Sequence, residues 1–157
     1  MKKLRFAIFG NTYQAKKSAC IEQLLGILLE RGASLLIDRQ FYEYLTGKLG
    51  ILVTPEALIE GNDFHADFVI SMGGDGTFLE AARRVGDKGM PILGINMGRL
   101  GFLSDYQAED IASAIDHIYN DTYRIEERTV LMVEKDGDDI QGYPYALNEV
   151  AVLKHDI

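Results

Sequence analysis

The sequence is short of several features that define broad protein classes. It has a single cysteine, Cys20, so no intrachain disulfide is possible. No run of 18 apolar residues occurs, so no membrane span is expected. The 16 basic residues are outnumbered by 24 acidic ones, and the formal charge of −8 disfavours nucleic acid and anionic membranes as partners. We therefore expect a cytoplasmic protein with no nucleic-acid or membrane partner.

Size and composition are those of an ordinary globular protein. The 157 residues indicate one domain, or one domain and part of a second. At 47% hydrophobic and 25% charged, the chain has enough apolar side chains to form a core. Cys20 lies between Ala19 and Ile21 in a helical pattern, which favours a core position over a nucleophile. Because basic side chains are few, any polyphosphate ligand would need backbone N–H groups or metal ions.

The most informative stretch is the glycine-rich segment Ser71-Met72-Gly73-Gly74-Asp75-Gly76-Thr77-Phe78-Leu79. Residues 67–70 before it are β-branched and aromatic, which predicts a buried strand. After it, apolar residues at positions 78, 81, 82 and 85 predict one face of a helix. The glycines thus occupy a turn between strand and helix, where α/β proteins bind ligands. Glycine there permits positive φ and lets a ligand approach backbone N–H groups, and a helix N-terminus attracts phosphate.

Three interpretations of this loop compete. The first is a plain turn in which Asp75 or Thr77 caps the helix. The second is a dinucleotide-binding fingerprint, although Leu79 stands where the third glycine belongs. The third is a phosphoryl-transfer site; it is not a P-loop, because no Gly-Lys-Ser/Thr follows. A carboxylate at position 75 would repel phosphate unless it binds a metal or takes a proton during the reaction.

The elements before this loop alternate between strand and helix. A strand is predicted at residues 4–9, a helix at 15–31 with Ile21, Leu24, Leu25 and Leu28 on one face, and a strand at 34–38. Strand, helix, strand is the unit of a parallel sheet with a right-handed crossover. A short helix is predicted at 41–45, while residues 46–62 show no clear pattern.

A second glycine-rich turn follows the next predicted strand. Residues 90–96 predict another parallel strand, which leads into Asn96-Met97-Gly98-Arg99-Leu100-Gly101-Phe102-Leu103. Two neighbouring strands that both end in glycine-rich turns at one sheet edge would form a cleft. A helix is predicted from Ala108 onward, and its apolar face is Ile111, Ala112, Ile115, Ile118 and Tyr119.

The pattern changes after residue 121. Residues 129–133 and 143–147 predict two strands, joined by an acidic turn at 136–139 that lacks the ligand spacing of a calcium loop. The predicted fold class is therefore α/β: a Rossmann-like parallel sheet with flanking helices, followed by the start of an incomplete antiparallel β domain. The corresponding domains are residues 1–120, which bind nucleotide, and residues 121–157, which begin a β-rich domain.

Three segments together resemble the motif series of the NAD kinase family. The loop at 73–77 resembles the signature shared by NAD kinases, diacylglycerol kinases and 6-phosphofructokinases. The segment at 94–103 and the sequence Asn148-Glu149-Val150 extend the resemblance to NAD kinases specifically. The family's later Gly-Ser-Thr-Ala-Tyr-type segment is absent, so the chain resembles the amino-terminal portion of such an enzyme.

The resemblance implies phosphoryl transfer from ATP, or from inorganic polyphosphate, to the 2′-hydroxyl of the adenosine ribose of NAD. It implies that Asp75 is the base, with metal ligation as its other possible role, and that a divalent metal, usually magnesium, assists. The NAD-binding residues it implies are Asp75, Gly76, Phe102, Asn148 and Glu149. The phosphate- and ATP-binding residues it implies are Gly73, Gly74, Gly76 and Thr77. Members of the family are commonly homo-oligomers.

Three alternatives remain open from the sequence. A non-catalytic nucleotide-binding fragment fits the missing β segment. A lipid kinase of the diacylglycerol type shares the first loop, but no basic amphipathic helix is evident. A plain α/β module would use both glycine-rich loops only as turns.

Overall fold

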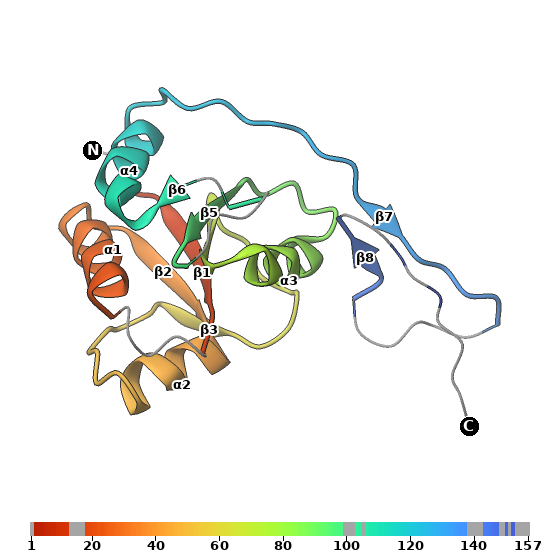
Figure 1. The fold of residues 1–157 in the computed structure, drawn as a ribbon, viewed down its shortest axis with the longest axis horizontal. Coiled ribbons are helices and arrows are strands. Elements are labelled where there is room, and N and C mark those ends of the chain that lie inside the picture. Colours follow the sequence, from red (N-terminus) through yellow and green to blue (C-terminus); the bar gives the residue numbers. More distant parts are fainter. Residues whose placement is uncertain are drawn as a thin grey trace.

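The computed structural model describes residues 2–12, 18–98, 103–104, 106–137, 143–147, 150 and 152. Its centre is a six-stranded sheet in the order β3-β2-β1-β4-β5-β6, and every neighbouring pair is parallel (Figure 1). The strands are β1 (Arg5–Gly10), β2 (Ser34–Asp38), β3 (Ala57–Ile59), β4 (Phe68–Gly73), β5 (Ile92–Asn96) and β6 (Tyr106–Gln107). This is the strand order of doubly wound nucleotide-binding folds.

Helices cover both faces of the sheet. They are α1 (Ser18–Glu30), α2 (Arg39–Gly47), α3 (Asp75–Val85) and α4 (Ile111–Tyr119), the last preceded by the 3-10 turn η2 (Ala108–Asp110). Apolar side chains of α1, α2 and α4 form one core with one face of the strands. Those of α3 and of the segment between β3 and β4 form a second core on the other face. Both faces are therefore buried, as an all-parallel sheet requires.

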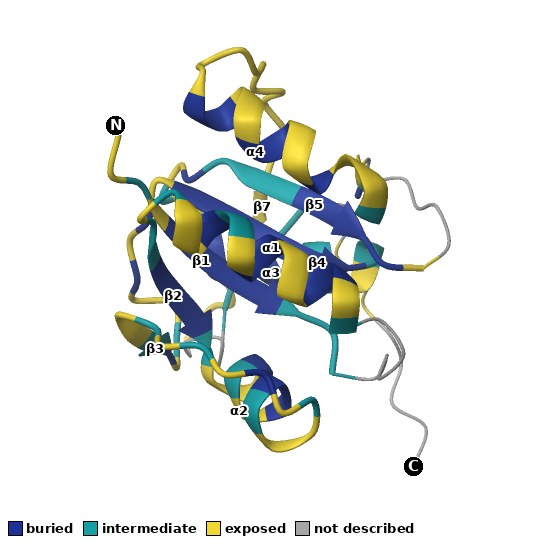
Figure 2. Cartoon of the chain, turned by 90° about the vertical axis from the view of Figure 1, so that its left-hand side faces the viewer, coloured by how far each residue is buried: buried dark blue, intermediate teal, exposed yellow. Residues whose placement is uncertain are grey.

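The two central strands, β1 and β4, are buried on both faces of the sheet, as predicted. Along β1, Phe6 and Ile8 belong to the first core, while Ala7 and Phe9 belong to the second. Every residue of β4 is buried, and Figure 2 shows the middle of the sheet as a continuous buried layer. The α1 face predicted from periodicity is confirmed, and Cys20 is buried beside it.

One prediction needs correction, and one strand was missed. The apolar face of α4 contains Ala114, whereas Ala112 is exposed. The reason is helical geometry: counted from Ile111, the positions i+3 and i+4 face the sheet and i+1 does not. The sequence also gave no sign of β3, because three residues are too few to show an alternation. β3 is recognisable only through its pairing with β2.

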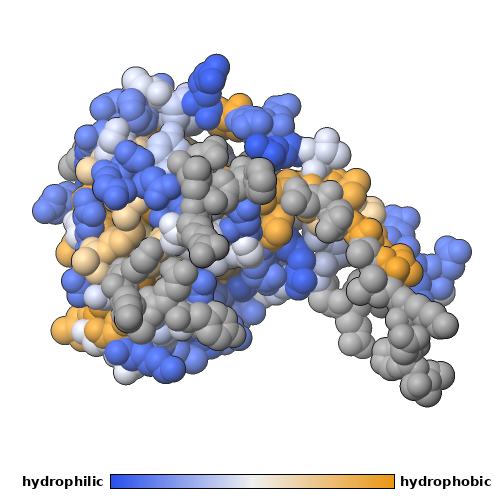
Figure 3. Space-filling model, in the orientation of Figure 1, coloured by the Kyte–Doolittle hydropathy of each residue, from blue (hydrophilic) through white to orange (hydrophobic). Residues whose placement is uncertain are grey.

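The chain beyond α4 leaves the sheet. Residues 121–130 are all exposed and run along the outside of the molecule to β7 (Leu131–Met132), which pairs antiparallel with β8 (Tyr145–Ala146) (Figure 1). The predicted hairpin is confirmed, although its strands are shorter. Val130, Leu131 and Met132 are exposed, and Figure 3 shows apolar atoms along this projecting part. The division of the chain at residue 120 stays a prediction.

Gly10, at the carboxyl end of β1, is expected to tolerate no side chain. A Cβ there would lie 2.2 Å from Cε1 of the buried Phe41. We expect Gly10→Ala to lower the free energy of unfolding by about 1–3 kcal/mol through overpacking. Gly26→Ala is the matched control: position 26 is exposed inside α1, with open space around it, so alanine should raise stability by about 1 kcal/mol. Urea unfolding measures both, and equal effects would contradict the packing argument.

Candidate functional site

The candidate site lies where the order of the strands reverses. From β1 the chain builds the sheet outward through β2 and β3, and from β4 it builds outward in the opposite direction. The carboxyl ends of β1 and β4 therefore lie side by side, with helices leaving toward opposite faces. The Asn11 N–H, just after β1, donates to the Met72 carbonyl of β4 at 3.0 Å. Ligands of doubly wound folds bind at this position.

The first glycine-rich loop is a very short turn between β4 and α3. β4 ends at Gly73, Gly74 is the N-cap, and Asp75 is the first residue of α3. Because Gly74 is the N-cap and Asp75 already lies inside the helix, the interpretation in which Asp75 or Thr77 is the N-cap gains no support. Gly74 has no side chain that could accept from the N–H groups of the first turn.

The three glycines of this loop have different roles. A Cβ on Gly73 would lie 2.4 Å from Oγ1 of Thr77 and 3.2 Å from Cβ of Asn11, so this glycine permits close packing within the protein. A Cβ on Gly74 or Gly76 would meet no atom within 4 Å. None of the three has a positive φ. Backbone conformation therefore does not require glycine here, and Gly74 and Gly76 instead leave space beside the helix N-terminus.

The second glycine-rich turn folds back onto the first. The Met97 N–H donates to the Gly73 carbonyl at 2.9 Å, which joins the two turns at their start. Oδ1 of Asp75 then accepts hydrogen bonds from the backbone N–H groups of Leu103, at 2.9 Å, and Ser104, at 3.4 Å. Both turns therefore lie at the same sheet edge, and the carboxylate of Asp75 is one of their points of contact. The cleft expected between them stays a prediction.

Within the second turn, one side chain replaces a backbone partner. Oδ1 of the buried Asn96 accepts from the Gly98 N–H at 2.8 Å. This bond reverses the chain directly after β5 and satisfies an amide that has left the sheet. Asn96 thus stabilises the start of the second glycine-rich turn, which was predicted from the sequence.

The structure brings together some of the predicted site residues. Gly73, Gly74, Asp75, Gly76 and Thr77 occupy one turn at the end of β4. The other three predicted residues, Phe102, Asn148 and Glu149, lie outside the described residues. Sequence analysis missed the backbone donors of residues 103 and 104. A backbone N–H has no residue-type signal, so only the fold could reveal them.

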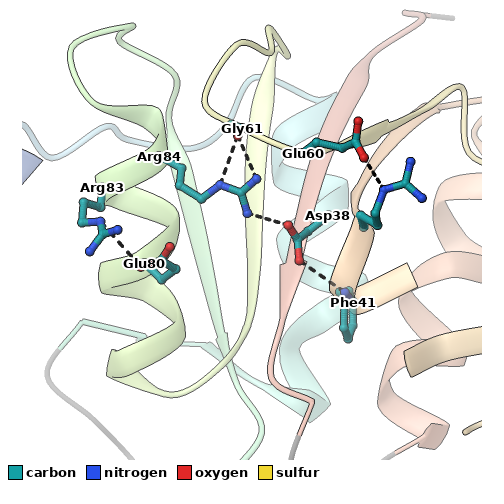
Figure 4. Close-up of polar contacts among 8 residues, drawn as sticks. Asp38, Phe41, Glu60, Gly61, Glu80, Arg83 and Arg84 are labelled. Carbon is teal, nitrogen blue, oxygen red and sulfur yellow. Dashed lines mark hydrogen bonds and ion pairs between the residues drawn. The ribbon is translucent and has the colours of Figure 1, made fainter. Parts of the chain in front are cut away.

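Asp38 ends β2, the position from which an acidic residue contacts ribose in dinucleotide-binding folds. Here its carboxylate is already engaged (Figure 4). Oδ1 pairs with Nη1 of the buried Arg84 at 2.5 Å, and Oδ2 accepts from the Phe41 N–H at the start of α2. Arg84 also donates twice to the Gly61 carbonyl and lies 4.8 Å from the centre of the Phe9 ring. Asp38 therefore holds elements together, and the dinucleotide fingerprint gains no support.

The far end of α3 anchors the β hairpin. The ring of Tyr145 packs on Gly86, where an added Cβ would lie 2.9 Å from it. The guanidinium of Arg83 lies 5.3 Å from the centre of the Tyr143 ring. Desolvation raises the pKa of the Tyr145 phenol, and the carboxylate of Asp87 raises it further. One helix therefore carries the glycine turn at its start and the hairpin at its end.

The described residues include no cluster of three or more histidine, cysteine, aspartate or glutamate side chains suited to a metal ion. At the glycine turn, Asp75 is the carboxylate in position to contact one. Magnesium is commonly held by one or two carboxylates together with substrate phosphates, and a single carboxylate at a helix N-terminus is compatible with that mode. Across the described part of the chain, no helix is long and apolar enough to cross a membrane.

Comparison with known proteins gives the family. The model of the ATP-NAD kinase N-terminal domain matches residues 6–123. The chain belongs to this family. It is 52% identical over 153 residues to a protein named NAD kinase from Bacteroides fragilis, covering 98% of this chain and 53% of the relative. The corresponding values for an NAD kinase of Porphyromonas gingivalis are 38% over 156 residues, 99% and 53%.

The fold has a counterpart among solved structures. The crystal structure of yeast NADH kinase complexed with NADH matches with a TM-score of 0.70 at 16% identity, covering 93% of this chain and 46% of the yeast chain. At that identity the match shows the fold. The NAD kinase family member described here spans about half the length of the curated relatives it matches.

The two neighbouring arginines near the end of α3 should differ sharply in their contribution to stability. We expect Arg84→Met to lower the free energy of unfolding by about 3 kcal/mol, because it leaves the largely buried Asp38 carboxylate without its partner. Arg83 is exposed and pairs with Glu80 at 3.7 Å, so Arg83→Met should cost about 0.5 kcal/mol. Urea unfolding measures both variants, and similar losses would mean that burial of the Asp38–Arg84 pair is not what matters.

Proposed function

We propose that the whole protein is an NAD kinase, which transfers a phosphoryl group from ATP or polyphosphate to the 2′-hydroxyl of the adenosine ribose of NAD. The observation that carries this proposal is the position of Asp75. Its carboxylate lies at the first residue of α3, beside the open positions of Gly74 and Gly76, and contacts the second glycine-rich turn. The names of the relatives support the same reaction.

The phosphate groups of the donor fit the start of α3. Gly74 and Gly76 have open space around them, and they lie at the start of α3, where backbone N–H groups and the positive end of the helix dipole favour phosphate. This arrangement places local positive potential on a chain whose formal charge is −8. A magnesium ion carried by the phosphates would supply the remaining charge neutralisation.

Asp75 fits the role of orienting the acceptor hydroxyl. Hydrogen bonds from two backbone N–H groups favour an ionised carboxylate, which can accept a hydrogen bond from the ribose hydroxyl. As the hydroxyl oxygen bonds to phosphorus and the bond from phosphorus to the donor breaks, the hydroxyl proton passes to Asp75. In a loose phosphoryl-transfer transition state this proton is lost late, so positioning contributes more than base strength.

The remaining contacts belong to the same proposal. Phe102, Asn148 and Glu149 contact NAD, and the docking of Tyr145 on α3 holds the strand that leads toward the last two. We infer the domain division at residue 120, a homo-oligomer and a cytoplasmic location on the family resemblance.

Asp75→Asn in the full-length protein tests the catalytic assignment. We expect NADP formation from NAD, magnesium and ATP to fall by at least about 100-fold, as for loss of a general base. The thermal unfolding midpoint and the dissociation constant for NAD should change little, since asparagine keeps the shape of the side chain. Coupled assay of NADP and calorimetry measure these quantities.

Asp63→Asn is the matched control, because Asp63 is an exposed aspartate in the segment between β3 and β4. Its turnover should equal that of the unmodified protein. Normal turnover by Asp75→Asn would refute the assignment of Asp75. If the unmodified full-length protein phosphorylated a lipid and not NAD, the substrate assignment itself would be wrong.

A further inference from the structure

Gly94, in the middle of β5, occupies the point where two other segments meet the sheet. It is buried. A Cβ at this position would lie 2.8 Å from Cδ2 of Phe78 on α3, 2.8 Å from Oγ of Ser104 and 2.9 Å from Cα of Ser104. Real Cβ atoms do not approach other atoms this closely, so an alanine here would displace one or both neighbours.

The two neighbours differ in how easily they can move. Phe78 is half-buried, and its contact is a ring atom at the end of a side chain. Ser104 has no exposed surface, and its contact includes the backbone Cα. Its hydroxyl has no hydrogen-bond partner, so no polar bond of that side chain would oppose a shift. A movement of the Phe78 ring would not relieve the 2.9 Å contact with Cα of Ser104, so an added methyl group would also move the backbone at Ser104.

The same backbone holds Asp75. The N–H groups of Leu103 and Ser104 both donate to Oδ1 of that carboxylate, at 2.9 and 3.4 Å. Two donors on one oxygen restrict rotation of the carboxylate and fix its direction at the start of α3. A displacement of the Ser104 backbone would shift or break both bonds. The space at Gly94 is thus linked to the orientation of the Asp75 carboxylate through the Leu103–Ser104 segment.

We propose that Gly94 is a positioning residue for the transfer reaction: because it lacks a side chain, the Leu103–Ser104 segment lies against β5 with its amides on Asp75. The inference rests on the proposed function of Asp75 and extends it to a residue on another strand. A misplacement of about 1 Å in such a site typically costs about 100-fold in rate. The effect should appear in kcat, because Gly94 is buried beneath the site.

The first test is Gly94→Ala in the full-length protein. We expect kcat for NADP formation to fall by at least about 30-fold, in line with the cost of a misplaced catalytic group. The dissociation constant for NAD should stay within about threefold, as expected when ground-state binding is unchanged. Gly26→Ala, an exposed glycine-to-alanine change in α1, should leave kcat unchanged. Unchanged kcat in Gly94→Ala, or a loss confined to NAD binding, would overturn the proposal.

A double variant separates the two neighbours of Gly94. If the loss arose from Phe78 and a shift of α3, Gly94→Ala combined with Phe78→Ala would restore turnover, because the smaller side chain removes that contact. The proposal predicts no restoration, since Cα of Ser104 remains in place. Full recovery of kcat in the double variant would therefore overturn it.

A second modification tests the amide contact on which the proposal depends, even if Gly94→Ala does not fold. Replacing Leu103 by its α-hydroxy acid analogue turns the amide N–H into an ester oxygen and leaves the side chain unchanged. We expect kcat to fall by about 10-fold or more, as for loss of one hydrogen bond to a charged group, with little change in NAD affinity. The same replacement at Leu52, which is 96% exposed, is the control. Equal kcat in the two esters would overturn the proposal.

Amide NMR separates this inference from the proposed function. The Leu103 N–H resonance should move in Asp75→Asn and again in Gly94→Ala, and should stay in place in Gly26→Ala. If the unmodified protein makes no NADP while these shifts occur, the proposed reaction is wrong and the structural coupling between Gly94 and Asp75 stands. If NADP forms and the Leu103 N–H resonance does not move in Gly94→Ala, the coupling between Gly94 and Asp75 is wrong and the proposed reaction stands.

Discussion

The arrangement of helices and turns around the sheet depends on the burial of β1 and β4 on both faces. Their side chains alternate between two cores, so helices are required on both sides of the sheet. Parallel pairing then forces each connection to cross over the sheet, which brings all the strand ends that carry turns to one edge. The strand order reverses between β1 and β4, and the helices that follow these two strands pack on opposite faces of the sheet. The candidate site is thus a consequence of how the core is closed.

Helix α3 links the core to the candidate site, because contacts hold the position of the helix on the sheet. Apolar packing through Ala81 and Val85 holds the helix on the sheet, but packing alone tolerates small sliding movements. The buried pair of Arg84 and Asp38, with two further bonds to the Gly61 carbonyl, is directional and fits one position of the helix. Burying those charges has a desolvation cost. What it provides is a fixed axial position for the turn that begins at Gly74.

Sequence patterns predicted the parts of the fold that repeat a simple physical rule. β1, β2, β4 and β5 are apolar runs between turn residues, and α1 shows an unbroken helical period. β3 was not predicted, because a three-residue strand exists only through its partner. The pairing of two glycine-rich turns followed from parallel topology. The donors to Asp75 did not, since Leu103 and Ser104 act through backbone N–H groups that any residue type would supply.

The glycines of the first turn and Gly94 of β5 also show that glycines of one sequence motif can be needed for different physical reasons. At Gly73 and Gly94 the missing Cβ lets protein approach protein, as the contacts with Thr77 and Ser104 show. At Gly74 and Gly76 the missing Cβ leaves open space at a helix N-terminus. Neither case involves a positive φ among these four. At Gly73 and Gly94 glycine is therefore required for close packing within the protein, whereas at Gly74 and Gly76 its effect is to leave the start of α3 uncovered.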